Sequence, residues 1–264
     1  MMLIHKWIHK IKKFLTKHRS KTGRENIRFV EIGSPRWTRK DIKDSIPVFC
    51  EIYRNRPIKD NSGGMKIQHA FFAWFILRYL KPKYIIESGI FKGQGTWLFE
   101  KASPDSTIYS IDINLSQRVY ISKNATYFSK DFTSLKWDKI DKGNTIVFFD
   151  DHQNAIKRLK FCKKEGFKAV IFEDNYPTGR GDCLSLKQAF DRDSKDAQFL
   201  KREVKVYYEM PPVLKSMLTS YGDDWDNKKY PTPEPLFSQV ESKNAQIFLD
   251  QVLEYVWMCY VELK

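Results

Sequence analysis

From residue 83 onward, short apolar runs alternate with segments in which apolar residues recur every three or four positions. Such runs are typical of buried strands, and strands are expected at 83–89, 106–114, 125–132, 145–151 and 167–175. Helices are expected between them, at 91–103, 152–166 and 183–192. The segment before them, 65–83, is apolar almost all round and predicts a buried helix that ends at Pro82. Strands that alternate with helices form a parallel sheet covered on both faces, so the pattern predicts a doubly wound, Rossmann-like α/β fold.

The last quarter of the chain is less regular. A helix is expected at 242–254 and a terminal strand at 255–263. The segments 204–214 and 230–237 are rich in aromatic residues and proline. The region 204–240 is therefore expected either to be a lid that lines an acceptor pocket or to be a structural edge of the domain.

The N-terminal residues differ from the rest in charge. Residues 1–40 hold 12 of the 46 Lys and Arg residues and only two acidic residues, so +10 of the net charge of +14 lies there. Residues 2–17 predict a basic amphipathic helix, which is expected to contact either a membrane surface or a protein. We divide the chain into a leader and linker (1–27) and one domain (28–264) with its core at about 60–200. Nucleic acid is a disfavoured partner, because nucleic-acid enzymes more often carry their positive charge on the folded body.

The cysteines and the apolar runs limit the location of the protein. The four cysteines are widely spaced and form no CxxC pair, which argues against a zinc motif or a disulfide framework (Cys50, Cys162, Cys183, Cys259). A reducing compartment fits best, so we expect a cytoplasmic protein, peripheral at a membrane if residues 2–17 bind one. No apolar run reaches the roughly 18 residues that a membrane span needs. Self-association into a homo-oligomer is compatible with the sequence.

A glycine-rich turn follows the first expected strand, in the stretch ESGIFKGQGT. It places Gly89, Gly93 and Gly95 between a strand and a helix, with Glu87 two residues before the first glycine. Glycines there allow a tight turn and a close approach of the backbone to a ligand. The next strand ends in Asp112, where a carboxylate can bind the two hydroxyls of a ribose. No Gly-Lys-Ser/Thr follows, so the turn is not a P-loop.

This pattern resembles motif I of the class I S-adenosylmethionine (SAM) methyltransferases. The resemblance implies a mostly parallel seven-stranded sheet and SAM as the cofactor. It places Glu87 and the three glycines near the methionine and ribose, and Asp112 on the ribose hydroxyls. It also places Asp131, after the third strand, near the adenine. Read without the resemblance, Gly93 and Gly95 are turn formers and Asp131 is a helix cap.

Polar side chains end two neighbouring strands of the expected sheet. FFDDHQ contains Asp150 and Asp151, and VIFEDNYP contains Glu173, Asp174 and Asn175. The carboxyl ends of parallel strands lie at one edge of a sheet, so these groups can converge beside the cofactor. Carboxylate and amide oxygens suit a hard divalent cation, which would offset the cost of burying the charges. The alternative is that both groups cap the segments that follow them.

These strand ends resemble those of the metal-dependent O-methyltransferases, among them the catechol O-methyltransferase, macrocin O-methyltransferase and cephalosporin hydroxylase-like groups. The resemblance covers roughly residues 60–190. It implies Mg²⁺ or another divalent cation, bound by four residues of this chain (Asp151, Asp174, Asn175 and Glu173). It also places Met65 where that family closes over the cofactor.

The general base departs from the family pattern. Catechol O-methyltransferase has a lysine three residues after its metal-binding aspartate, and the chain has Asn154 there. His152 lies beside the expected metal site, and Lys157 lies one helical turn beyond Asn154. These two residues are the candidate catalytic groups, although metal coordination can itself acidify a hydroxyl.

The sequence thus favours a SAM-dependent, divalent-metal-assisted O-methyltransferase that acts on a small hydroxylated molecule or a sugar or glycan acceptor. Three alternatives stay open at this point. One is an iron enzyme of the cephalosporin hydroxylase-like group on the same scaffold. The others are a nucleic-acid methyltransferase and a non-catalytic SAM-binding protein at the membrane periphery.

Overall fold

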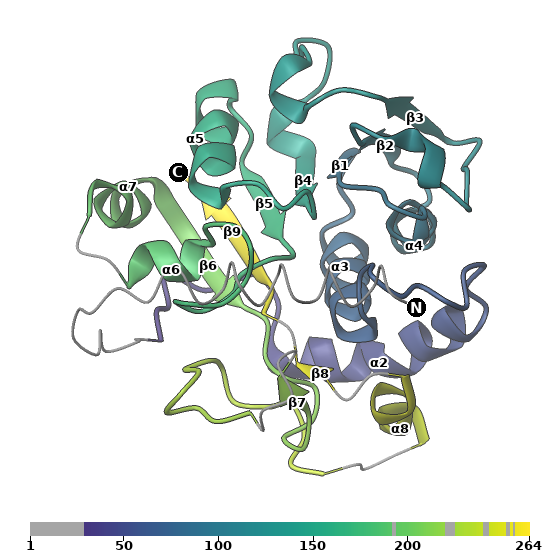
Figure 1. Ribbon diagram of the computed structural model, residues 1–264, viewed down its shortest axis with the longest axis vertical. Helices are drawn as coiled ribbons and strands as arrows, with labels where there is room; N and C mark the ends of the chain where they lie inside the picture. Colours follow the sequence, from purple (N-terminus) through teal and green to yellow (C-terminus); the bar gives the residue numbers. More distant parts are fainter. Residues whose placement is uncertain (1–28, 192–193, 220–224, 240–242, 252–253, 256) are drawn as a thin grey trace, which may run out of the picture.

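The computed structural model describes residues 29–264 except 192–193, 220–224, 240–242, 252–253 and 256. The leader helix expected at 2–17 therefore lies outside the described residues. The described part is built around one sheet with helices on both faces (Figure 1).

The sheet has seven strands in the order β3-β2-β1-β4-β5-β9-β6. Their bounds are β1 Tyr84–Ser88, β2 Thr107–Ile111, β3 Ala125–Phe128, β4 Thr145–Phe149, β5 Ala169–Phe172, β6 Val204–Glu209 and β9 Cys259–Leu263. Strands β1 to β5 pair in parallel, and β9 pairs antiparallel with both β5 and β6. The expected mostly parallel, seven-stranded, Rossmann-like sheet is confirmed, including the terminal strand.

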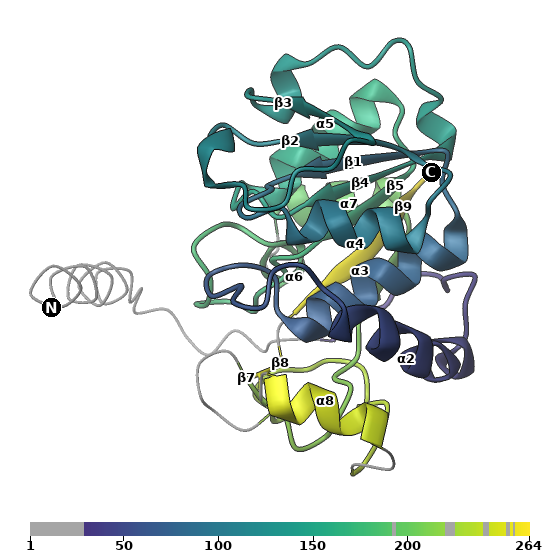
Figure 2. The ribbon, with the colours of Figure 1, turned by 90° about the vertical axis from the view of Figure 1, so that its right-hand side faces the viewer.

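Successive residues of the central strands point to opposite faces, as a strand requires. On β1, Ile85 joins the core on one face and Ile86 the core on the other. The first face is covered by α2 Arg39–Arg54, α3 Ile67–Leu80 and α4 Gln94–Ala102. The second face is covered by α5 Ala155–Glu165, α6 Leu186–Phe190 and α7 Lys195–Glu203, and Figures 1 and 2 show the two layers.

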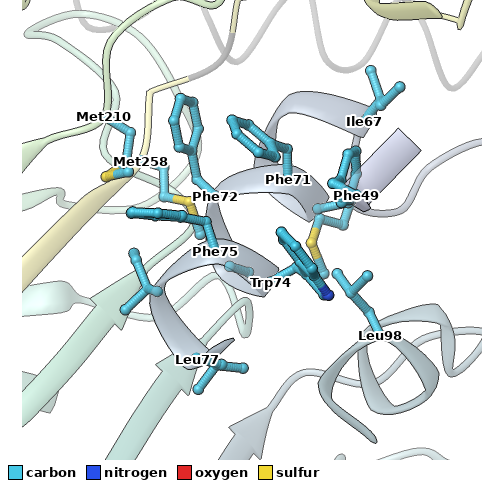
Figure 3. Close-up of a cluster of buried hydrophobic side chains, with 14 of the residues drawn as sticks. Phe49, Ile67, Phe71, Phe72, Trp74, Phe75, Leu77, Leu98, Met210 and Met258 are labelled. Atoms are coloured by element: carbon cyan, nitrogen blue, oxygen red, sulfur yellow. The ribbon is translucent and has the colours of Figure 1, made fainter. Parts of the chain in front are cut away.

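Helix α3 is the centre of the first core, as its all-round apolar sequence predicts. Figure 3 shows Phe71, Phe72 and Phe75 packing with residues from distant parts of the chain, among them Phe49 of α2 and Met258 beside β9. This packing fixes the position of α3, the helix that precedes β1 and the glycine turn.

Two differences from the expectation involve helix capping. Helix α2 was not expected; it contains Pro47, but Thr38 and Asp41 form a capping box at its start. Helix α5 begins at Ala155 rather than 152, because the Asn154 side chain accepts a hydrogen bond from the Lys157 amide and caps the helix.

A smaller part lies beyond the sheet, near α2 (Figure 2). It holds α8 Lys243–Gln251 and a two-stranded pairing of β7 Leu218–Thr219 with β8 Glu254–Tyr255. Short 3₁₀ turns complete the chain at Leu115–Gln117, Phe132–Ser134 and Lys142–Asn144. Of the expected lid region, residues 204–209 are edge strand β6. Within the described part, no helix combines the length and apolarity needed to cross a bilayer.

Candidate cofactor and metal site

A cavity of about 310 Å³ opens at the carboxyl ends of β1, β2 and β4. Its lining includes Gly63, Gly64, Gly89, Asp112, Asp131, Asp150, Asp151, His152 and Arg158. A smaller recess adjoins it through shared residues and reaches Met65, Glu87 and Gly95. Six of the seven expected cofactor residues therefore line this joint space, and Gly93 does not.

The first glycine of the turn is required by the chain's own backbone. Gly89 has φ +98, and a Cβ there would lie 2.0 Å from the carbonyl oxygen of Asp150. Gly93 has φ +92 and would place a Cβ 2.4 Å from the carbonyl oxygen of Tyr120. The turn thus brings the ends of β1 and β4 into contact at the cavity, and Gly93 is explained by the turn that begins α4.

Glu87 is a buried carboxylate with one satisfied oxygen. Its Oε2 accepts hydrogen bonds from the hydroxyls of Thr96 and Ser110. Its Oε1 has no partner among the described residues and would lie 2.3 Å from a Cβ built on Gly95. Burial raises the pKa of Glu87 to about 7. A carboxylate in this position is suited to a cationic group in the recess.

Glu87→Gln is expected to change the pH dependence of stability. Because the pKa of Glu87 is raised, the folded state keeps a proton that the unfolded state loses. The wild-type protein therefore loses stability as the pH rises from about 4.5 to about 7. The variant lacks this loss. Its stability relative to the wild type should therefore be about 2–3 kcal/mol greater at pH 8 than at pH 5. Urea titrations at the two pH values measure this. Glu51→Gln, on an exposed position of α2, is the control; equal shifts in the two variants would contradict the assignment.

Asp112 organises the glycine turn from the end of β2. Its Oδ2 accepts the amides of Ile90 at 2.9 Å and Phe91 at 3.3 Å, and its Oδ1 accepts the amide of Asn114 at 2.9 Å. The carboxylate is only partly buried and lines the cavity. It is therefore both a support of the turn and a group within reach of a ligand.

Arg158 is a site residue that the sequence did not single out. Its guanidinium donates to both oxygens of Asp131, at 3.0 and 2.6 Å, and lies 2.9 Å from Asp151 Oδ2. Ser88 Oγ also donates to Asp151 Oδ2, at 2.7 Å. The bidentate contact with Arg158 holds the pKa of Asp131 well below its usual range. The available signal was an arginine on the buried face of an amphipathic helix, one turn after the capping Asn154.

Asp150, rather than Asp151, is the carboxylate grouped with Asp174. Ligand atoms of Asp150, His152 and Asp174 lie within 4.8 Å of one another. Burial, and then the neighbouring charge of Glu173, raise the pKa values of both Asp150 and Asp174. Two carboxylates held close together out of water are the arrangement that a divalent cation stabilises.

The other expected metal ligands have protein partners. Glu173 is paired with His69 Nδ1 of α3, whose charge lowers the pKa of Glu173 against the opposing effect of burial. Asn175 is fully buried, and its Nδ2 donates to Tyr207 Oη at 2.9 Å while its Oδ1 accepts the Lys187 amide at 3.0 Å. With Asp151 held by Arg158, Asp174 is the one expected ligand that falls in the group.

The two candidate catalytic residues are placed differently. His152 lines the cavity with φ +52, an uncommon backbone conformation for a non-glycine residue. Its Nδ1 lies 3.1 Å from Asp174 Oδ2 and 3.3 Å from Asp182 Oδ1. Hydrogen bonding to Asp182 raises the pKa of His152 to about 9. Lys157 is exposed on α5 and is not among the described residues that line the cavity.

A buried ion pair between α6 and β6 lies next to this edge of the sheet. Lys187 Nζ donates to both carboxylate oxygens of Glu209, at 2.8 and 2.7 Å, and to the carbonyl of Pro231 at 2.6 Å. Tyr207 Oη donates to Glu209 Oε1 at 2.8 Å and accepts from Asn175. The network links the residue after Asp174 to α6 and β6.

Comparison with known proteins gives distant structural similarities. No family model matches the chain, and no curated protein matches it. The solved structure described as "cmcI-N160 SAH" is 20% identical over 42% of this chain and 62% of its own, with a TM-score of 0.37. The related "CmcI-N160 apo-structure" is covered over 52% of its length, so the chain spans less than two thirds of either.

Two further structures are similar over most of their length. The plantazolicin methyltransferase BpumL, in complex with a pentazolic analog and SAH, is 13% identical over 86% of this chain and 99% of its own (TM-score 0.47). The O-methyltransferase TomG from Streptomyces achromogenes, in complex with SAM, is 12% identical over 87% and 97% (TM-score 0.46). These similarities are too distant to assign an activity.

Proposed function

We propose that the protein is a SAM-dependent O-methyltransferase whose acceptor hydroxyl is oriented by a divalent cation. The observation that carries the proposal is the convergence of three features on one cavity at the carboxyl edge of the sheet. These are the turn at Gly89, the carboxylate of Asp112, and the carboxylate of Asp150, which lines the cavity and whose ligand atoms lie within 4.8 Å of those of Asp174. In an open α/β sheet this edge is where ligands bind.

The groups around the glycine turn fit SAM. A carboxylate offers about four acceptor positions, and backbone amides occupy three of those on Asp112, so one remains for a ribose hydroxyl. The unpartnered Oε1 of Glu87 offers a charge partner for the ammonium group. Bound SAM supplies a methyl group on a positively charged sulfur. Asp131, held by Arg158, is proposed to face the adenine end of the same cavity.

The carboxylate pair fits a divalent cation. Asp174 Oδ1 is buried and accepts no hydrogen bond from any described residue, and Asp150 lines the cavity itself. A cation there would act as a Lewis acid that lowers the pKa of a coordinated hydroxyl. Glu173 and Asp151, which are paired with His69 and Arg158, would set the charge around the pair rather than bind the ion.

The chain's own residues would position the reaction. His152 lines the cavity beside the carboxylates, and its pKa of about 9 makes the ring a charge partner of Asp174 rather than a proton acceptor near neutral pH. As a neutral ring it would be a ligand of the cation. The exposed position of Lys157 gives no support to a catalytic role for it. The acceptor is proposed to be a small polyhydroxylated molecule or a glycan, because an oxygen-directed cation site requires a hydroxyl to coordinate.

The proposal is tested by following SAH formation from SAM with a panel of diols, phenols and sugars. We expect turnover that EDTA removes and added divalent cation restores. Asp150→Asn should lose the cation-dependent part, while Asp138→Asn, at an exposed position, should keep it. Turnover that is insensitive both to EDTA and to Asp150→Asn would contradict the role of the cation.

A further inference from the structure

A second group of metal-ligating side chains shares Asp174 with the first. Ligand atoms of Asp174, Asp182 and Cys183 lie within 4.8 Å of one another. His152 Nδ1 lies 3.3 Å from Asp182 and 3.1 Å from Asp174, so it joins the two groups. Asp182 and Cys183 come from the loop between β5 and α6, whereas His152 follows β4. The loop therefore adds a thiol to donors that the strand ends supply.

An independent feature indicates that a ligand belongs between them. Asp174 is only 7% exposed, and its Oδ1 has no hydrogen-bond partner in the described part of the chain. A buried carboxylate oxygen without a partner is costly unless a cation or donor satisfies it. The same carboxylate lies within ligand distance of donors on both sides.

The loop is held in place by hydrogen bonds at its ends. The amide of Ala155 donates to the carbonyl of Leu184 at 2.9 Å, which ties the loop to the start of α5. Ser185 Oγ donates to the carbonyl of Tyr176 and accepts the amide of Gln188, so it closes the loop and caps α6. These bonds fix the backbone on the C-terminal side of Cys183, next to the site.

The donor chemistry decides which cation fits. Mg²⁺ takes oxygen ligands almost exclusively, whereas Zn²⁺ and related transition-metal ions accept imidazole nitrogen and thiolate sulfur. Cys183 is also the one partly accessible thiol, because the other three cysteines are buried. Cysteine spacing alone could not reveal this role, since the donors come from two separate loops.

We infer that the site binds a transition-metal ion of the Zn²⁺ class through Asp174, Asp182, Cys183 and His152, and that it discriminates against Mg²⁺. The inference refines the cation in the proposed function: Asp174 and His152 contact both groups, so Asp150 flanks the ion on the cavity side, and the catalytic meaning of the ion rests on the proposed function. Binding of the ion itself does not depend on SAM. Catalytic zinc sites hold the ion with three protein donors and keep a fourth position open, so an acceptor hydroxyl would displace one of these four donors or enter as a fifth ligand.

The test uses Co²⁺ as a spectroscopic probe of the full-length protein. We expect Co²⁺ to produce a thiolate-to-metal charge-transfer band that Zn²⁺ abolishes by competition and Mg²⁺ does not, with Zn²⁺ at least about 100-fold tighter than Mg²⁺. Cys183→Ser should lose the band, and Cys50→Ser should keep it. The histidines of the leader (His5, His9, His18) can bind Co²⁺ as well, but only a thiolate gives this band.

A second measurement needs no variant. Burial raises the pKa of the Cys183 thiol to about 12, so iodoacetamide should alkylate it slowly in the native wild-type protein, and Zn²⁺ but not Mg²⁺ should slow the reaction further. Absence of the band, or alkylation that Zn²⁺ does not slow, would overturn the inference. SAH binding is measured on the same protein: metal binding without SAH binding would refute the proposed function and leave the metal site standing, and the reverse result would refute the metal site alone.

Discussion

Replacing Gly89 with alanine is expected to lower the free energy of unfolding by about 3–5 kcal/mol and to abolish SAH binding. Two costs add at this position. The backbone has φ +98, which an L side chain rarely adopts, and the new Cβ would lie 2.0 Å from the Asp150 carbonyl oxygen. The atoms that this Cβ would meet belong to the backbone of Asp150 and Asp151, so the clash is relieved only if the ends of β1 and β4 separate. These ends form the cavity.

Gly179→Ala is the matched control for this substitution. Gly179 has φ +81, but a Cβ there would meet no atom within 4 Å. It therefore incurs only the conformational cost, about 1–2 kcal/mol. Urea denaturation of both variants separates the two contributions, and equal losses would show that the contact between the strand ends is not tight.

Removing the buried ammonium of Lys187 is the second change with a large expected effect. Lys187→Met should lower the free energy of unfolding by about 3–5 kcal/mol, because it leaves the Glu209 carboxylate without its cation. The two side chains are 1% and 2% exposed, so solvent cannot replace the lost partner. Glu209 also accepts the hydroxyl of Tyr207, which in turn holds Asn175 beside Asp174. The substitution should therefore also disturb the position of Asn175 next to the proposed cation site.

The double variant Lys187→Met/Glu209→Gln removes the unpaired charge and is expected to recover part of the loss. Lys163→Met serves as the control, since its contact with Glu203 at 3.1 Å is more exposed and should be worth less than about 1 kcal/mol. Thermal or urea unfolding measures all three. A Lys187→Met loss no larger than that of Lys163→Met would show that the buried pair does not stabilise the fold.

The sheet could be predicted because its strands are apolar runs bounded by turn residues. The run at 145–151 became β4, and 255–263 contains the antiparallel strand β9. Helix α2 was not predicted, although its buried residues Ile42, Ile46 and Phe49 recur at helical spacing and Thr38 and Asp41 mark its start. The proline inside it, Pro47, does not prevent the helix.

The location of the site was predictable, but the pairing of its atoms was not. Strand periodicity places Asp150 and Asp151 at the right edge, yet adjacent residues point in different directions. Both line the cavity, but Asp151 is paired with Arg158 of the helix that follows, whereas Asp150 is grouped with Asp174. Asn175 likewise faces the interior because Tyr207, 32 residues away along the chain, meets it there. Contacts of this kind depend on tertiary packing, and no regular spacing of residues in the sequence indicates them.

The central claim, that the cavity beside Gly89 binds SAM, is tested most directly by titration calorimetry with SAH. We predict saturable binding at one site to the wild-type protein, weakened about 10–100-fold in Asp112→Ala, because a hydrogen bond to a charged group and the support of the turn are both lost. Asp138→Ala, at an exposed position, should bind as the wild type does. No binding to the folded wild-type protein, or equal binding by Asp112→Ala, would contradict the account.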